Sequence, residues 1–499
     1  MTVTKLPATP VAATRSFMTD MATKGSMRSD FIDLDRPAVP QGPSRVKEIE
    51  QRNRAARIWT LVLDDDPTGT QTVRDVHVLT TDWSENQLEW ASRHPSGLTF
   101  ALTNSRSLDG PDAGRLTHDI VATAAAVAHA RGLKLRVVSR SDSTLRGHFA
   151  VELAAVHTAL TAAGVPARGT LFVPAFLEAG RVTARDIQWV ETPAGFVPAA
   201  TTEFAQDATF GYEERDLRSW VAARTGSVEM LPPTSISLID LRTPDGAKTV
   251  HERLSSLSGG QTTIANAVRA EDLETLMMAV LDEEEAGHSL VIRSGPSFVR
   301  LCGAQLPSPP LQSTDFPVKT GGSPRGLVVI GSHTELTNSQ VAHATTHHRL
   351  HVIDMDGTRI IPGGSDREVE IQRCAREVTA ALEHTDVLFR TSREVLNSAD
   401  QTPLEVSTRI AGAVVDTVRD VMSKAAPSFL IAKGGITSSD MAVRALGVRK
   451  ATVVGQMLPG LIPVWKLLDG LVPDLPYVIF PGNVGTADTL THVLATVKS

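Results

Sequence analysis

The segment from Ile58 to Gln71 reads IWTLVLDDDPTGTQ and decides the fold class. Its apolar opening predicts a buried β-strand, and Asp64, Asp65 and Asp66 follow directly at the strand end. Charged groups leave water only where something compensates them, so three carboxylates are costly at this place. In open α/β sheets, ligands bind in the crevice beyond the strand ends. The segment therefore predicts a strand that carries a site, which could hold a hydroxylated substrate, a metal or a proton in transfer.

Short apolar runs like this one recur along the chain and alternate with helical patterns, of which 112–131 and 405–425 have the clearest apolar stripes. Such alternation is typical of parallel sheets with helices on both faces. We therefore predict an α/β fold with two domains, each with a largely parallel sheet flanked by helices. The predicted strands are 58–63, 98–103, 133–138, 170–173 and 289–293, then 327–330, 351–354, 387–390, 429–432, 452–454 and 477–480.

The length of 499 residues is too great for one ordinary domain. Residues 306–325 are rich in proline and glycine and have little periodicity, as expected of an interdomain linker. We therefore expect one domain over 51–305 and a second over 326–499. Residues 1–50 are expected to form a poorly ordered extension that docks near its end. The polar region 201–259 is expected to hold an irregular or added element.

The composition excludes several classes of partner. The net charge of −7 and the absence of a basic stripe argue against nucleic acid. No apolar run approaches the roughly 18 residues of a membrane-spanning helix, so no membrane partner is expected. The two cysteines, Cys302 and Cys374, form neither a metal-binding spacing nor a disulfide framework. This usage favours a reducing, cytoplasmic setting.

Three further polar loops follow predicted strands of the first domain, at 104–107, 139–147 and 174–183. Together with the acidic turn they would lie along one sheet edge. Hydroxyls and backbone amides there can hold an anion, and arginine can grip a carboxylate with two bonds. Ordinary helix caps and proline- and glycine-bounded loops are the alternative for each loop taken alone. A crevice of this composition suits a small polyhydroxy acid, with candidate residues Thr68, Asp142, Ser143, Arg146 and Arg181.

Glycine turns follow three predicted strands of the second domain, at Gly331-Ser332, at 434–437 and at Gly482. Glycine lets backbone amides approach a phosphate, and a helix N-terminus adds a partial positive charge. A tight strand-to-helix turn is the alternative for any single one. Three in one domain favour a nucleotide or phosphate site, although neither a Walker sequence nor a dinucleotide-binding glycine fingerprint is present.

Four histidines, at positions 343, 347, 348 and 351, have a spacing that could place two imidazoles on a metal. No Cys, Asp or Glu nearby completes a ligand set, so a partly exposed helix end is the favoured alternative. We expect no metal site built by the chain itself.

With these motifs the chain resembles the four-carbon acid sugar kinases, over roughly residues 58 to 490. The combination of the first two motifs is the specific part of the resemblance. The matching motifs are D-D-x-T-G at Asp65–Gly69, D-S-T-L-R-G at Asp142–Gly147, P-A-F-x-x-x-G-R at Pro174–Arg181, G-S-x-x-x-x-T-x-x-Q at Gly331–Gln340 and G-G-x-T at Gly434–Thr437.

The resemblance implies a sugar-acid-binding N-terminal domain and an ATP-binding C-terminal domain, with Mg²⁺ accompanying ATP. The expected reaction is phosphoryl transfer to a hydroxyl of threonate, erythronate or 3-oxo-tetronate. Arg146, with Arg181 or Arg140, would clamp the substrate carboxylate, and Asp65 or Asp66 would orient the hydroxyl and accept its proton. By motif, the nucleotide site would be lined by Ser332, Gly434, Gly435, Ile436, Thr437 and Gly482.

Departures from the family pattern stand at Pro67, at Thr70-Gln71, at Ser139-Arg140 and at 480–485, where a lysine and a serine are lost. We expect Pro67 and Thr70-Gln71 to influence substrate preference, because these changes flank the substrate site. The alternatives are a binding protein of the same fold without turnover and a metal-dependent hydrolase. Monomer and homodimer both stay open.

Overall fold

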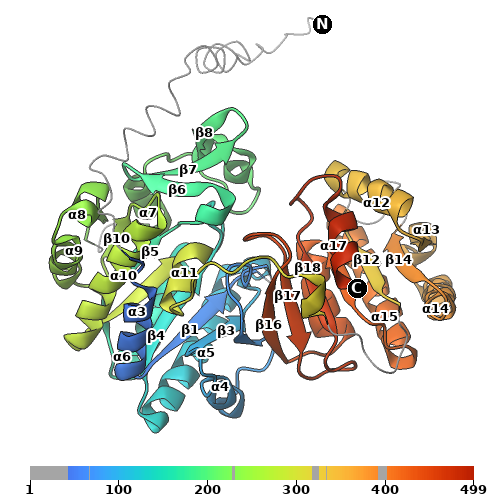
Figure 1. Cartoon of the computed structure of the whole chain (residues 1–499), viewed down its shortest axis with the longest axis horizontal. Helices are drawn as coiled ribbons and strands as arrows, with labels where there is room; N and C mark the ends of the chain where they lie inside the picture. Colours follow the sequence, from blue (N-terminus) through green and yellow to red (C-terminus); the bar gives the residue numbers. More distant parts are fainter. Residues whose placement is uncertain are drawn as a thin grey trace, which may run out of the picture.

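The computed structural model describes residues 43–66, 68–226, 231–316, 325–332, 334–391 and 402–498, so Pro67 lies outside the described residues. In these ranges the fold is α/β, with a sheet of 15 strands, helices on both of its faces and a separate three-stranded sheet. In Figure 1 the first domain, in blue to yellow, and the second, in orange to red, lie side by side. Every predicted strand overlaps an observed one, and the predicted fold class is confirmed.

The strands of the first domain run parallel in the spatial order β2-β3-β1-β4-β11-β5-β10-β9. β1 is buried along its whole length because helices cover both faces of the sheet. The strands are β1 (Ile58–Asp64), β2 (Val76–Leu79), β3 (Leu98–Leu102), β4 (Lys134–Arg140), β5 (Ala167–Val173), β9 (Thr234–Ile236), β10 (Thr262–Ala265) and β11 (Ser289–Ser294).

Successive residues of β1 pack into different hydrophobic clusters, as period-two alternation requires. Leu61 joins a cluster with α4 to α7, and Val62 joins one with α3 and α8 to α11. These helices are α3 (Val46–Ala55), α4 (Glu85–Ala91), α5 (Gly110–Arg131), α6 (Phe149–Ala162), α7 (Leu217–Thr225), α8 (Leu238–Arg242), α9 (Gly246–Ser255), α10 (Ala270–Glu285) and α11 (Pro296–Cys302).

The second domain repeats this arrangement with parallel strands in the order β13-β14-β12-β15-β18. α12 and α17 share one hydrophobic cluster, and α14 and α15 share the other. The elements are β12 (Leu327–Ile330), β13 (Leu350–Met355), β14 (Asp386–Thr391), β15 (Leu430–Lys433), β18 (Pro476–Phe480), α12 (Glu335–His347), α13 (Gly357–Ile360), α14 (Gly364–Ala381), α15 (Pro403–Lys424), α16 (Gly435–Asp440) and α17 (Thr489–Val497).

The two domains share one continuous sheet instead of having separate ones. β16 (Lys450–Gln456) pairs antiparallel with β2 of the first domain, and β17 (Pro463–Leu467) pairs antiparallel with both β16 and β18. A prediction from strand and helix alternation sees only neighbours in sequence, so it could not reveal this long-range pairing.

An added element follows β5. Strands β6 (Arg181–Ala184), β7 (Ile187–Thr192) and β8 (Gly195–Pro198) form the separate antiparallel sheet, and two short 3₁₀ helices, at Ala199–Thr201 and Glu203–Gln206, continue it. In Figure 1 this sheet and α12 both lie at the top of the molecule, one on each domain. The sequence predicts an added element within 201–259, whereas the observed one begins earlier, at Arg181.

Ordered structure at the N-terminal end begins before residue 51. Helix α3 docks on α10, where Glu274 accepts from the Ser44 hydroxyl and the Arg45 amide and Arg52 pairs with Asp282. The expected boundary between residues 50 and 51 therefore falls inside a helix.

Part of the expected linker packs on the second domain. The amide of Leu311 donates to the carbonyl of Gln456, and Leu311 and Phe316 join that domain's hydrophobic cluster.

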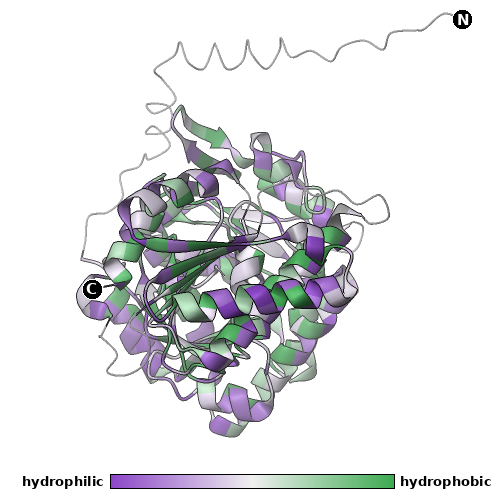
Figure 2. Ribbon diagram, turned by 90° about the vertical axis from the view of Figure 1, so that its right-hand side faces the viewer, coloured by the Kyte–Doolittle hydropathy of each residue, from purple (hydrophilic) through white to green (hydrophobic). Residues whose placement is uncertain are grey.

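Apolar side chains concentrate on the strands. Figure 2 shows largely green central strands, whereas the helices around them alternate between green and purple along their length. This alternation is expected of helices with one buried face. In the residues that the structure describes, no helix is both long enough and apolar enough to span a bilayer.

Candidate active site

Asp64 ends β1 and pairs with Arg140, the last residue of β4, because the two strands run in register. Arg140 Nη1 donates to Asp64 Oδ1 at 2.9 Å, and both side chains are buried. Burial raises the pKa of Asp64 to about 7, although Arg140 opposes the shift. A Cβ on Gly69 would lie 2.0 Å from Asp64 Oδ2, so the following turn closes directly over this carboxylate. Asp64 thus holds the turn from inside.

Asp65 and Asp66 are both bound by Arg106, which extends from the short 3₁₀ helix Ser105–Ser107 after β3. Arg106 Nη2 donates to Asp65 Oδ1 at 2.7 Å, and its Nη1 donates to Asp66 Oδ2 at 3.0 Å. The sequence flags the loop 104–107 as polar but does not single out Arg106. Arg106 reaches Asp65 and Asp66 because β1 pairs with β3, which brings the loops after these two strands together.

The two carboxylates differ in burial and in proton affinity. Side-chain exposure is 2% for Asp65 and 23% for Asp66. Burial raises the pKa of Asp65. Burial would raise that of Asp66 as well, but Arg106, Arg140 and the two bonds from Thr68 outweigh it and lower the pKa. Thr68 donates to Asp66 Oδ1 through its amide at 2.8 Å and its hydroxyl at 2.6 Å, so Thr68 shapes the turn.

The loop at 141–147 lies against the acidic turn. Asp142 accepts from Arg146 Nε at 2.7 Å and from the amide of Thr144 at 2.9 Å. Despite burial, Arg106 and Arg146 hold the pKa of Asp142 well below its usual range. Gly147 has a φ of +120°, and a Cβ there would lie 2.9 Å from Asp65 Oδ2. Glycine therefore permits the close approach of the two motifs.

Arg181 and Arg146 converge on one aromatic ring. Arg181 Nη1 donates to Ser143 Oγ at 2.8 Å and lies 3.8 Å from Asp142. The guanidinium carbons of Arg146 and Arg181 lie 5.2 and 5.1 Å from the ring centre of Phe204, within cation–π range. Asp207, 3.6 Å from Arg146, completes this rim. Phe204 and Asp207 lie beyond β8, in a part of the chain that carries none of the sequence motifs.

The three predicted glycine turns of the second domain meet because β12, β15 and β18 are neighbours in the sheet. A Cβ on Gly331 would lie 1.9 Å from Thr437 Oγ1, and one on Gly482 would lie 2.8 Å from Ser332 Oγ. Gly434 has a φ of +124°, which favours glycine. Thr337 Oγ1 donates to the Gly482 carbonyl at 3.1 Å, tying two of the turns together.

Around these turns the backbone is open on one side. A Cβ on Gly435 would meet no atom of the described residues within 4 Å, and the Ile436 side chain is 76% exposed at the start of α16. An exposed isoleucine beside clustered glycines offers an apolar contact at the start of α16.

Lys433 lies at the end of β15, directly before these turns, and the sequence does not single it out. The side chain is fully buried, its Nζ donates to the Pro481 carbonyl at 3.1 Å, and it lies 3.8 Å from the centre of the Phe480 ring. Among the described residues no carboxylate pairs with it, and burial lowers its pKa to about 7. A buried lysine whose charged form is disfavoured therefore lies beneath the glycine turns.

Two of the four histidines join α12 and the residue after it to α17, one pair of them stacks, and His351 lies apart in β13. His343 Nδ1 lies 2.7 Å from Thr491 Oγ1, His348 Nε2 lies 2.9 Å from the Thr491 carbonyl, and the rings of His343 and His347 are stacked. The described residues contain no group of three His, Cys, Asp or Glu side chains placed to hold a metal.

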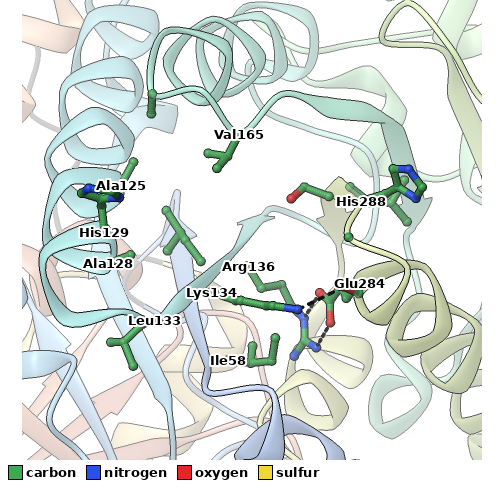
Figure 3. Close-up of a pocket in the computed structure, with 15 residues that line it drawn as sticks. Ile58, Ala125, Ala128, His129, Leu133, Lys134, Arg136, Val165, Glu284 and His288 are labelled. Carbon is green, nitrogen blue, oxygen red and sulfur yellow. Dashed lines mark hydrogen bonds and ion pairs between the residues drawn. The ribbon is translucent and has the colours of Figure 1, made fainter.

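A cavity of about 260 Å³ lies at the opposite end of the first domain's sheet (Figure 3). It is lined by Ile58 and Lys134, which begin β1 and β4, and by the buried ion pair of Arg136 with Glu284. The candidate site lies at the carboxyl ends of the same strands, so this cavity is not part of it.

The fold and the two sets of loops define a two-domain protein with a cluster of charged side chains at strand ends of one domain and three clustered glycine turns at strand ends of the other. Family comparison agrees: residues 60–301 match the sugar-binding N-terminal domain, and residues 327–490 match the nucleotide-binding C-terminal domain. The chain belongs to the four-carbon acid sugar kinase family, whose domains these are.

Among its relatives is the D-threonate kinase of Salmonella typhimurium, 24% identical over 374 residues, which are 72% of this chain and 79% of the relative. Two crystal structures share the fold. A Salmonella typhimurium protein has a TM-score of 0.64 at 16% identity, covering 87% of this chain and 98% of that one. A Haemophilus influenzae protein has a TM-score of 0.61 at 19% identity, covering 88% and 100%.

Proposed function

We propose that the protein is an ATP-dependent kinase that phosphorylates a hydroxyl of a small four-carbon acid sugar such as threonate, erythronate or 3-oxo-tetronate. The observation that carries the proposal is the Arg106 bridge between Asp65 and Asp66, with Asp142, Arg146 and Arg181 beside it. Carboxylates suit hydroxyl groups, and arginines suit a carboxylate. The kinship with a D-threonate kinase supports the same substrate class.

The glycine turns fit a nucleoside triphosphate. Gly331, Gly434 and Gly482 lie where any Cβ would collide with a neighbouring loop or take up a strained backbone. Such packing brings backbone amides within reach of phosphates. Ser332 and Thr437 would add hydroxyl bonds, and Ile436 would contact an apolar part of the nucleotide. Bound ATP supplies the phosphoryl group, and Mg²⁺ held chiefly by phosphate oxygens and water needs no cage of protein ligands.

In the first domain, Arg146 and Arg181 would bind the substrate carboxylate, and Phe204 would keep both guanidiniums in place. Asp65 and Asp66 would orient the attacking hydroxyl. We assign the proton acceptor to Asp66, because its side chain is the more exposed of the two. Its low pKa suits phosphoryl transfer, in which positioning and charge neutralisation contribute more than base strength.

The direct test is a panel of four- and five-carbon acid sugars, each incubated with the protein and Mg-ATP, with ADP release and sugar phosphate measured together. We expect ADP release that depends on one or more four-carbon acids, with equal amounts of sugar phosphate. Binding of the acid and of ATP without turnover would favour a binding protein of the same fold. Acid-independent chemistry that a chelator abolishes and zinc restores would favour the hydrolase.

A further inference from the structure

The acidic turn continues into residues 70–72, whose side chains bond to both domains. Thr70 Oγ1 accepts a hydrogen bond from Trp465 Nε1 of β17 at 2.9 Å, and each residue is 1% exposed. Two residues later, Thr72 Oγ1 donates to the Pro296 carbonyl of α11 at 3.0 Å. The segment directly after the turn that carries Asp65 and Asp66 therefore has a buried side-chain bond to each domain.

From Trp465 a continuous set of contacts reaches the nucleotide turns. Trp465 lies opposite Tyr477 of β18, with ring centres 6.3 Å apart. The Tyr477 hydroxyl donates to the carbonyl of Ser438 in α16, the helix that begins at Gly435. All three residues are at most 1% exposed. We call Thr70, Trp465, Tyr477 and Ser438 the Thr70–Ser438 chain.

Packing of this kind transmits displacement, because a close-packed interior has no free volume in which one side chain can move alone. α16 runs directly into a π-helical turn at Met441–Ala445, a distortion often found at functional sites. Movement of α16 upon nucleotide binding would therefore shift Tyr477 and Trp465, and with them the acidic turn. β16 pairs with β2 on one side and with β17, which carries Trp465, on the other, so the Thr70–Trp465 bond lies beside a paired part of the sheet.

We propose that the Thr70–Ser438 chain couples the two sites, so that nucleotide bound at α16 fixes the acidic turn in its reactive geometry. This inference rests on the proposed kinase function. By linkage, the acid sugar must tighten nucleotide binding by the same factor. Thr70 and Trp465 are positioning residues that act through Asp65 and Asp66. Thr70, where the family pattern differs, thus contributes to domain coupling.

The test measures the dissociation constant of the non-hydrolysable analogue AMP-PNP by calorimetry, with and without D-threonate or another acid that the panel identifies. In the wild type we expect the acid to tighten AMP-PNP binding about fivefold or more. Thr70→Val and Trp465→Phe each remove the bond and should bring that ratio close to one. The double variant should lose no more than either single variant, because the two residues make one shared bond.

Steady-state kinetics separate positioning from simple structural damage. Thr70→Val should lower kcat about tenfold, because a small displacement of the acidic turn misplaces the reacting groups, and it should leave AMP-PNP affinity without acid unchanged. Thr70→Ser keeps the hydroxyl and should restore both the ratio and kcat. Thr72→Val is the matched control, because it removes an equally buried bond of the same turn that ends within the first domain. It should lower stability and keep the ratio.

The coupling would be overturned if the acid did not change AMP-PNP affinity in the wild type. It would also be overturned if Thr70→Val and Trp465→Phe both kept the ratio of the wild type, or if Thr72→Val lost as much of that ratio as they do. If the wild type binds both ligands but transfers no phosphate, the kinase proposal fails while the binding ratio still decides the coupling. If it transfers phosphate and the ratio ignores Thr70 and Trp465, the coupling alone fails.

Discussion

The two candidate sites of this protein are built from different materials. The crevice of the first domain consists of charged side chains that neutralise one another, as Arg106 does for Asp65 and Asp66. The site of the second domain consists of backbone brought close by glycine, with the buried side chain of Lys433 beneath it. Side chains can distinguish one small acid from another, whereas backbone amides suit the phosphates that all nucleotides share. Substitutions of charged residues in the first domain and of glycines in the second should therefore affect different steps, the reaction of the acid sugar and the binding of ATP.

The largest effect is expected in the charged site. Asp66→Asn keeps the shape of the side chain and removes the proton acceptor, so kcat should fall about 100-fold or more. The melting temperature should change little, because Arg106 keeps its bonds to Asp65. A coupled ADP-release assay and a thermal melt measure the two quantities. Asp119→Asn, at a 78% exposed side chain on α5, is the control and should leave both unchanged. A kcat close to that of the wild type would remove Asp66 from the mechanism.

A smaller and different effect is expected in the backbone site. Gly331→Ala places a Cβ where Thr437 Oγ1 now lies 1.9 Å away, so the two turns must separate. Displacing a binding loop by such an amount should raise the KM for ATP about tenfold and leave acid sugar affinity unchanged. Gly435→Ala, whose Cβ meets no described atom within 4 Å, is the control for folding and should melt as the wild type does. An unchanged KM for ATP in Gly331→Ala would show that these turns do not bind the nucleotide.

The smallest effect concerns the cation that lacks an acidic partner in the described residues. Burial lowers the pKa of Lys433 from 10.5 to about 7. Below pH 7 the protein must bury a charged lysine. Between pH 7 and 10.5 only the unfolded chain binds the proton, so this cost shrinks as the pH rises. Lys433→Met should therefore raise the melting temperature by a few degrees at pH 6, and the gain should fade toward pH 10.

Melting curves at several pH values measure the gain from Lys433→Met. Lys424→Met, at a side chain that is 53% exposed, should show no such trend. A gain that grows with pH would show that Lys433 is not buried as a costly cation.

Local patterns in the sequence predict most of this architecture. Strands such as β1 and β12 are recognisable because an apolar run and the polar turn after it are adjacent in sequence. The same holds for the turns at Asp65 and Gly434. Since the fold places strand ends together, the sequence could predict that these turns are neighbours, and the structure shows two such groups.

What the sequence could not predict depends on partners far away along the chain. Arg106 bonds to residues 40 and 41 positions earlier, and Trp465 bonds to a residue 395 positions earlier. Phe204 lies in a part of the added element that no motif covers, and Lys433 looks like an ordinary surface residue until its burial is known. Asp142 binds Arg146 here, a pairing that the motif alone does not reveal, and its contact with substrate stays a prediction.

The continuous sheet has a consequence for how this chain can be divided. Many two-domain proteins can be cut at their linker to give two independently folding pieces. A cut here between residues 303 and 325 would strip β16 from β2 and leave one unpaired strand edge on each fragment, although β2 would still pair with β3 and β16 with β17. Exposed edges of this kind invite pairing with other chains. The fragments would thus be suited to complementation, each supplying the missing edge of the other, and poorly suited to production alone.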